Sequence, residues 1–92
     1  MIGAADRFQR NEQILAQHID EEMVLLNPID GHYFALDEVS SRVWALCDGT
    51  RSVAEVQAAL FEEYEAPADV IAADVTELLE ELADERLVVK AC

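Results

Sequence analysis

Apolar and polar positions alternate every second residue in the first third of the chain and follow a helical period in the rest. Residues 13–19 alternate, residues 23–29 form a second apolar run, and residues 32–36 form a third. Asp30 and Gly31 separate the last two runs, and an Asp-Gly pair there is a strong hairpin signal because glycine accepts a positive φ. The pattern therefore predicts a three-stranded antiparallel β-meander.

Three helices are predicted after the meander. Asp37 is placed to cap the first helix, and Gly49 is placed to end it. Ser52 opens the second helix, where Glu55 three residues later completes a Ser-x-x-Glu capping box. Pro67 is acceptable in the first turn of the third helix, which carries a long apolar stripe.

These elements, in this order, predict an α+β fold that is winged-helix-like, with a three-stranded antiparallel β-meander followed by three α-helices. The turn at residues 48–51 forms a helix-turn-helix-like corner in this interpretation. Residues 87–89 are apolar, which indicates a small closing strand or a packed tail. Residues 1–12 are predicted to be a short flexible N-terminus and residues 13–90 a single domain.

The composition is strongly acidic, with 20 Asp plus Glu against 6 Lys plus Arg and a formal net charge of −14 in 92 residues. Such a surface repels nucleic acid and anionic membranes, so neither is expected as a partner. No run of roughly 18 apolar residues is present, and a cytoplasmic protein is the expectation. Two cysteines are too few for a disulfide framework or a zinc site, and Cys47 is predicted to be a buried core thiol.

No catalytic arrangement of residues stands out in the sequence. His18 and His32 fall on separate predicted strands. The adjacent acids Glu80 and Glu81 point roughly 100° apart on a helix, which is typical of a solvated acidic face. A phosphate-binding glycine loop and a nucleophile elbow are both missing from the sequence. We therefore expect a protein that is not an enzyme and that uses no metal and no cofactor.

The third predicted strand is the informative feature, because it lies at the edge of the meander. Tyr33 and Ala35 face one way while Phe34 and Leu36 face the other, and both sets are apolar. An uncovered edge beside the third helix makes a groove that suits an extended peptide bound by strand addition. In the alternative interpretation Tyr33 and Val70 complete the core, and the edge is covered by the strand at residues 87–89.

Several short segments also occur together in a specific order. Gly-His-Tyr-Phe-Ala-Leu-Asp-Glu-Val occupies residues 31–39, and Leu-Cys-Asp-Gly occupies residues 46–49. Ser-Val-Ala-Glu-Val follows at residues 52–56 and Leu-Leu-Glu-Glu-Leu at residues 78–82. Over residues 13–89 this series resembles the PqqD-like family, which comprises recognition elements for the precursors of ribosomally synthesised, post-translationally modified peptides.

The resemblance implies a non-catalytic, winged-helix-like domain that binds the leader segment of a precursor peptide between its third strand and its third helix. It then delivers the peptide to a separate leader peptidase or other modifying enzyme. The implied peptide site consists of Tyr33, Phe34, Ala35 and Leu36 on the strand and Val70, Ile71, Asp74, Val75 and Leu78 on the helix. Asp69, Asp74 or Glu77 would pair with basic leader residues, and Phe34, Val75 and Leu78 are also candidates for the core.

Two pathways fit this resemblance. The hairpin at residues 30–34 favours the freestanding leader-binding proteins of lasso peptide biosynthesis, and the alternative is the chaperone of pyrroloquinoline quinone biosynthesis, whose partner is a radical S-adenosylmethionine enzyme. Two distant alternatives fit less well. A winged-helix DNA-binding protein needs Lys or Arg on its recognition helix, and residues 52–67 contain neither. An acyl-carrier protein needs an Asp-Ser-Leu motif, whereas Ser40 lies at the wrong spacing from Asp37.

Overall fold

A computed structural model of the chain describes residues 2–20 and 22–91, so Cys92 lies outside the described residues. Within them the chain forms six strands and three helices. The elements in chain order are β1 Arg7–Arg10, β2 Leu15–Ile19, β3 Glu22–Leu26, β4 Tyr33–Leu36, α1 Glu38–Leu46, β5 Asp48–Ser52, α2 Val53–Glu63, α3 Ala68–Asp84 and β6 Val88–Ala91.

The predicted meander is confirmed as an antiparallel sheet in the order β2–β3–β4. Leu26 of β3 lies opposite Leu15 of β2 and opposite Tyr33 of β4. The turn between β3 and β4 places Gly31 at a φ of 76°, and its amide donates to the carbonyl oxygen of Asn27 at 2.8 Å. The Asp-Gly pair therefore forms the predicted hairpin, since positive φ costs glycine little.

A second antiparallel sheet, in the order β5–β1–β6, was not predicted. Its central strand β1 lies within the segment that we expected to be a flexible N-terminus, and β5 occupies the residues expected to form a turn between two helices. Gly49 has a φ of 85°, and a Cβ there would lie 3.3 Å from Oε1 of Gln9. Gly49 therefore allows β5 to approach β1 closely and does not terminate α1, which already ends at Leu46.

The helix caps agree with the sequence pattern. The Asp37 carboxylate accepts a hydrogen bond from the Ser40 amide at 2.8 Å, which caps α1. The Ser52 hydroxyl accepts from the Glu55 amide at 3.2 Å, and the Glu55 carboxylate accepts from the Ser52 amide at 3.0 Å, which completes the capping box of α2. Pro67 precedes α3 and provides no side-chain cap.

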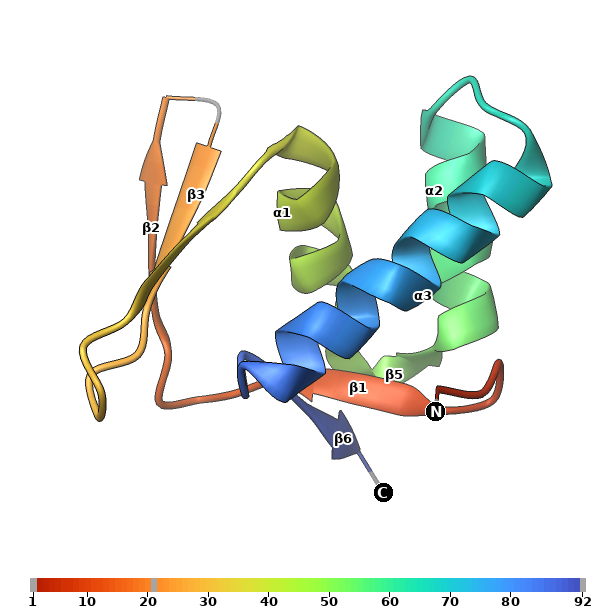
Figure 1. Cartoon of the computed structure of the whole chain (residues 1–92). Helices are drawn as coiled ribbons and strands as arrows, with labels where there is room; N and C mark the ends of the chain where they lie inside the picture. Colours follow the sequence, from red (N-terminus) through yellow and green to blue (C-terminus); the bar gives the residue numbers. More distant parts are fainter. Residues whose placement is uncertain (1, 21, 92) are drawn as a thin grey trace.

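The hydrophobic core lies where the helices meet the two sheets. Figure 1 shows α1 between the meander and the α2–α3 pair, with the β1–β5–β6 sheet beneath the helices. Cys47 is buried as predicted, at 2% exposure, and burial raises the pKa of its thiol to about 12. The largest fully buried side chains are Leu25, Leu60, Leu79, Leu87, Val43, Val75 and Val88. The architecture is thus the predicted α+β class, extended by the second sheet.

Within the described residues, no helix is long and apolar enough to cross a membrane.

Candidate functional site

Strand β4 is an edge strand of the meander and pairs with β3 along one side only. Among residues 2–20 and 22–91, no strand pairs with its other side. The closing strand predicted near residues 87–89 does form, as β6, but it pairs with β1 in the other sheet. The alternative in which this strand covers the β4 edge is therefore wrong, and the edge presents backbone groups that another strand can pair with.

The hairpin also determines which amides of β4 point toward the free edge. The Asn27 amide donates to the His32 carbonyl oxygen at 2.9 Å, so these two residues form a hydrogen-bonded pair. Bonded and non-bonded pairs alternate along antiparallel strands. Tyr33 and Ala35 therefore direct their amide and carbonyl groups away from β3, while those of Phe34 face β3.

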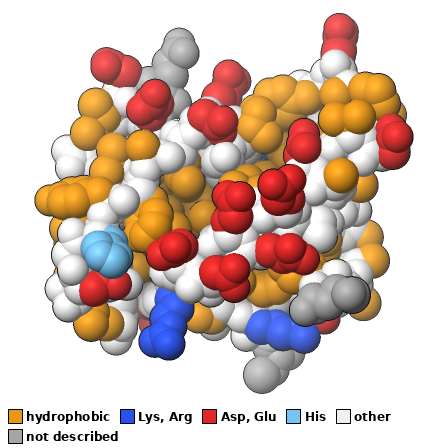
Figure 2. Space-filling view, viewed as in Figure 1, with side chains coloured by type: hydrophobic (Ala, Val, Ile, Leu, Met, Phe, Trp, Pro, Cys, Tyr) orange, Lys and Arg blue, Asp and Glu red, His pale blue; other side chains and the backbone are white. Residues whose placement is uncertain are grey.

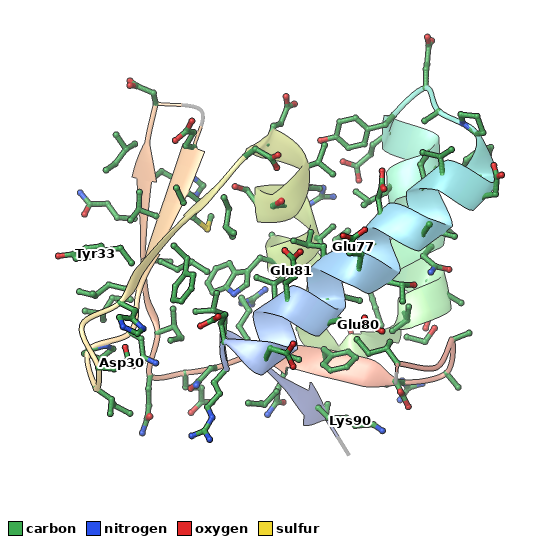
Figure 3. The ribbon with its side chains drawn as sticks, viewed as in Figure 1. Asp30, Tyr33, Glu77, Glu80, Glu81 and Lys90 are labelled. Carbon is green, nitrogen blue, oxygen red and sulfur yellow. The ribbon has the colours of Figure 1, made fainter. Side chains whose placement is uncertain are left out.

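The side chains of β4 alternate between two environments, as the sequence indicates. Tyr33 is 71% exposed and Ala35 is exposed, and Figure 3 shows the Tyr33 side chain pointing away from α3. On the opposite face Leu36 is buried at 6%, and Phe34 is half-buried against the core. Leu36 is thus a core residue, and what β4 offers a ligand is chiefly its backbone and its exposed face.

A cleft of about 580 Å³ lies between α1 and α3 and is bounded at one end by the last turn of α2. Its apolar lining comes from all three helices, and part of it is also hydrophobic core. The cleft is lined by Asp37, Val39, Ser40, Val43, Leu60, Tyr64, Glu65, Ala66, Ile71, Asp74, Val75, Glu77, Leu78 and Glu81.

The predicted helix residues divide into two groups. Ile71, Asp74, Val75, Glu77 and Leu78 line the cleft, and their spacing of three or four residues places them on one face of α3. Within this group Ile71 and Val75 are buried and Leu78 is half-buried, so they serve the core as well as the cleft. Asp69 and Val70 do not line the cleft, and Val70 is 46% exposed.

Carboxylates surround the mouth of the cleft. Five of its lining residues are acidic, and none of the described lining residues is Lys or Arg. Figure 2 shows the acidic side chains gathered over α3, with hydrophobic side chains on either side of them. Figure 3 shows Glu77 and Glu81 on the side of α3 that faces α1, and Glu80 on the other side. The cleft thus combines an apolar floor with a negative rim, which suits a ligand that is apolar and cationic.

The sequence did not indicate the part that α1 and the end of α2 play in this cleft. Val39 of α1 lines the cleft and is 39% exposed there. Tyr64 lies at the end of α2, and partial burial, followed by the charges of Glu38 and Glu63, raises its pKa above the ordinary value. Its hydroxyl is therefore neutral and remains a hydrogen-bond donor and acceptor at neutral pH.

The histidines do not combine with other groups into a catalytic arrangement. His18 is exposed on β2, and His32 is exposed with its Nδ1 3.5 Å from the Asp30 carboxylate. In the described part of the chain, no group of three or more His, Cys, Asp or Glu residues is placed to hold a metal ion. None of the four predicted β4 residues lines the cleft. The β4 edge can pair with another backbone, and the cleft can bury apolar groups and attract positive charge.

Fold and site together define a small α+β domain with a winged-helix-like arrangement, a free strand edge and an acidic apolar cleft. Residues 22–88 match the family described as Coenzyme PQQ synthesis protein D (PqqD). The chain belongs to the PqqD family, as the sequence resemblance predicted.

Curated relatives support the same assignment. The PqqA binding protein of Bradyrhizobium diazoefficiens is 34% identical over 82 residues, covering 89% of this chain and 78% of the relative. The PqqA binding protein of Gluconobacter oxydans is 38% identical over 85 residues, covering 92% of this chain and 86% of the relative. Both alignments span most of the domain.

Solved structures share the fold. TbiB1 in complex with the TbiA(beta) leader peptide is 32% identical, with a TM-score of 0.78 over 87% of this chain and 93% of that one. Lasso peptide synthetase B1 complexed with the leader peptide has a TM-score of 0.80, covers 90% of this chain and 98% of that one, and is 24% identical. At 24% identity, the similarity to lasso peptide synthetase B1 shows a shared fold and nothing more. The predicted winged-helix-like α+β class is confirmed.

Proposed function

We propose that this chain binds the leader segment of a ribosomally synthesised precursor peptide and, without catalysing a reaction itself, delivers it to a separate leader peptidase or other modifying enzyme. The free edge of β4, where Tyr33 and Ala35 direct their backbone groups outward, is the observation that carries this proposal. The names of the relatives support it, because they describe proteins that bind a precursor or its leader.

In this proposal the leader adds a strand to β4, and its backbone bonds fix the register. Leader side chains that point toward the helices enter the cleft, where Ile71, Val75 and Leu78 provide apolar contacts. Asp74 and Glu77 at the rim attract basic leader residues. Leu36 does not contact the leader, because its side chain is buried and its backbone groups face β3.

Asp69 and Val70 lie outside the cleft, at the N-terminal end of α3. In the proposed site these two residues contact the leader only if it extends beyond the cleft, past the start of α3.

The precursor we favour is that of a lasso peptide. The Asp-Gly-His-Tyr-Phe hairpin supports this choice, as does the likeness to TbiB1, which is 32% identical and was solved with a leader peptide. The alternative is the precursor in pyrroloquinoline quinone biosynthesis, which the curated PqqA binding proteins favour.

A direct binding measurement separates the two pathways. Fluorescein-labelled synthetic peptides, one corresponding to the TbiA(beta) leader and one to PqqA, are titrated with the full chain and followed by fluorescence anisotropy. We expect micromolar or tighter binding of the lasso leader and at least tenfold weaker binding of PqqA. The reverse order would assign the chain to the quinone pathway, and saturable binding of neither peptide would contradict the proposed function for both precursor types.

Hydrogen exchange tests the mode of binding. Addition of the peptide that binds more tightly in the titration should slow hydrogen exchange of the Tyr33 and Ala35 amides, because strand addition gives these amides new hydrogen-bond acceptors. Binding without protection of these amides would exclude strand addition at β4.

A further inference from the structure

The outward face of the meander is mostly apolar and has no element packed on it in the described structure. We call it the outer sheet face. The strand register places side chains from all three strands on it, in rows that run across the sheet. It comprises Leu15, Gln17 and Ile19 of β2, Glu22, Val24 and Leu26 of β3, and Tyr33 and Ala35 of β4.

Several of these side chains are exposed to an extent unusual for their size. Leu15 is 58% exposed, Ile19 50% and Tyr33 71%, and Ile29 in the adjoining turn is 75% exposed. Helix α1 packs on the other face of the sheet, where Leu25 is fully buried. In Figure 1 the meander extends to one side of the helices. Contiguous exposed apolar surface of this kind marks a protein interaction site.

Charge indicates what kind of partner fits this face. The centre of the outer sheet face carries no charged side chain, whereas Asp20 and Glu22 lie at the β2–β3 end and Asp30 at the β3–β4 end. A second copy of the chain carries the same net charge of −14, so self-association sets like charges against each other. A protein with an apolar patch flanked by Lys or Arg is complementary to the face.

We propose that the outer sheet face docks the enzyme that processes the bound peptide, through an apolar patch flanked by basic residues on that enzyme. This inference rests on the proposed function, because β4 belongs to both surfaces. Its edge is the peptide site, and its outward side chains Tyr33 and Ala35 form part of the outer sheet face. A strand added to β4 extends this face, so alternate side chains of the peptide come to lie beside the docked enzyme.

Shared use of β4 has a thermodynamic consequence. If the enzyme contacts both the outer sheet face and the added strand, leader binding tightens enzyme binding. By linkage, the enzyme then tightens leader binding by the same factor.

The test uses the full chain, a synthetic leader peptide and the purified enzyme that acts on the same precursor. The double variant Leu15→Ser/Ile19→Ser removes apolar surface from β2, away from the β4 edge. The matched control is Phe61→Ser, because Phe61 on α2 is also 50% exposed but lies on a different surface. Titration calorimetry measures enzyme binding and leader binding separately for each variant.

We expect the double variant to bind the enzyme at least tenfold more weakly while its leader affinity stays within twofold of the parent. Phe61→Ser should leave both affinities unchanged. If the double variant does not fold, as judged by circular dichroism, the single variants carry the same comparison with smaller expected losses.

Unchanged enzyme affinity in the folded β2 variants would overturn the docking proposal. A dimer of the parent chain that dissociates in these variants would assign the outer sheet face to a second copy and would also overturn it. Loss of enzyme binding in the variants would support docking even if the parent failed to bind a leader. A parent chain that binds the enzyme but no leader would contradict the proposed leader binding and leave the docking proposal standing. The two proposals can therefore be tested separately.

Discussion

The guanidinium carbon of Arg10 lies 5.5 Å from the centre of the Trp44 ring, and Nη1 of Arg10 donates a hydrogen bond to the carbonyl oxygen of Ala45. Arg10 ends β1 and Trp44 lies in α1, so this contact joins the second sheet to the helix that forms one wall of the cleft. Trp44 in turn donates from Nε1 to the carbonyl oxygen of Leu87 at 3.4 Å. Three distant segments of the chain therefore meet at one aromatic ring.

Replacement of Arg10 should destabilise the fold without changing the peptide site. Arg10→Met loses a cation–π contact and a hydrogen bond from a charged donor, so the free energy of unfolding should fall by about 1–2 kcal/mol. Urea denaturation followed by circular dichroism measures the change. Arg7→Met, at an exposed position on the same strand, is the matched control. Equal losses in the two variants would show that the Arg10–Trp44 contact has no special role.

The β4 edge can be tested with two alanines in the same sheet. Ala35 on β4 and Ala16 on β2 are both exposed, and both direct their amides toward a free edge because bonded pairs alternate along the sheet. Proline removes that amide without breaking a bond to β3. Ala35→Pro should therefore weaken leader binding at least tenfold in an anisotropy titration, whereas Ala16→Pro should leave it within twofold.

Two results of this comparison would contradict strand addition at β4. One is full affinity in a folded Ala35→Pro chain. The other is an equal loss in both proline variants, which would indicate a general disturbance of the sheet.

The elements that the sequence predicted are those whose signals are local. The Asp-Gly hairpin, the Asp37 cap and the capping box at Ser52 and Glu55 each depend on residues at most three positions apart. The alternation along β4 also separated the exposed Tyr33 from the buried Leu36 correctly. Short-range geometry of this kind can be read without knowing how distant segments pack.

The second sheet could not be predicted in the same way. Arg7–Arg10 and Asp48–Ser52 are short, mostly polar strands, and Phe8 is the single buried residue in the two strands. Such segments become strands because they pair with one another and with β6 across most of the chain length. Tertiary pairing decides their structure, and their own pattern of residues resembles a loop.

The candidate site was predictable in part, for a related reason. The helical period placed Ile71, Val75 and Leu78 on one face of α3, but it could not show what that face meets. The structure sets it against α1 and the end of α2, which makes these residues both core and cleft lining. It also adds Glu81 to the rim, one turn beyond Glu77, where the sequence showed only a solvated acidic pair.

The acidic rim should contribute modestly to binding of a basic leader. Glu77→Gln removes a carboxylate that lines the cleft, and Glu80→Gln removes one from the other side of α3. Exposed ion pairs are typically worth about 0.2–1 kcal/mol, so Glu77→Gln should weaken binding by roughly 1.4- to fivefold at low salt. Glu80→Gln should change affinity less.

Salt provides an independent check on this assignment. Added salt screens exposed charges, so the difference between the two glutamine variants should narrow as ionic strength rises. Asp74→Lys should weaken binding of the same leader further, since it reverses a charge at the rim. Identical affinities for the parent chain and Asp74→Lys would remove this residue from the site.

Acid should destabilise the domain partly through Asp48, which begins β5. The Asp48 carboxylate accepts two hydrogen bonds from Thr50, one from its hydroxyl at 2.6 Å and one from its amide at 2.9 Å. These two bonds, together with the nearby positive charge of Arg51, lower the pKa of Asp48 to about 2. Since this pKa is below its value of about 3.9 in an unfolded chain, the stabilisation is present above pH 4 and is lost as the pH falls toward 2. Asp48→Asn removes the titrating group.

Urea midpoints at pH 7, 5, 4 and 3 test this account. We expect Asp48→Asn to be less stable than the parent chain at pH 7, and the gap between them to narrow as the pH falls below 4. Asp84→Asn, at an exposed acid at the end of α3, is the control and should track the parent chain. A gap for Asp48→Asn that stays constant from pH 7 to pH 3 would mean that ionisation of this carboxylate does not stabilise the turn into β5.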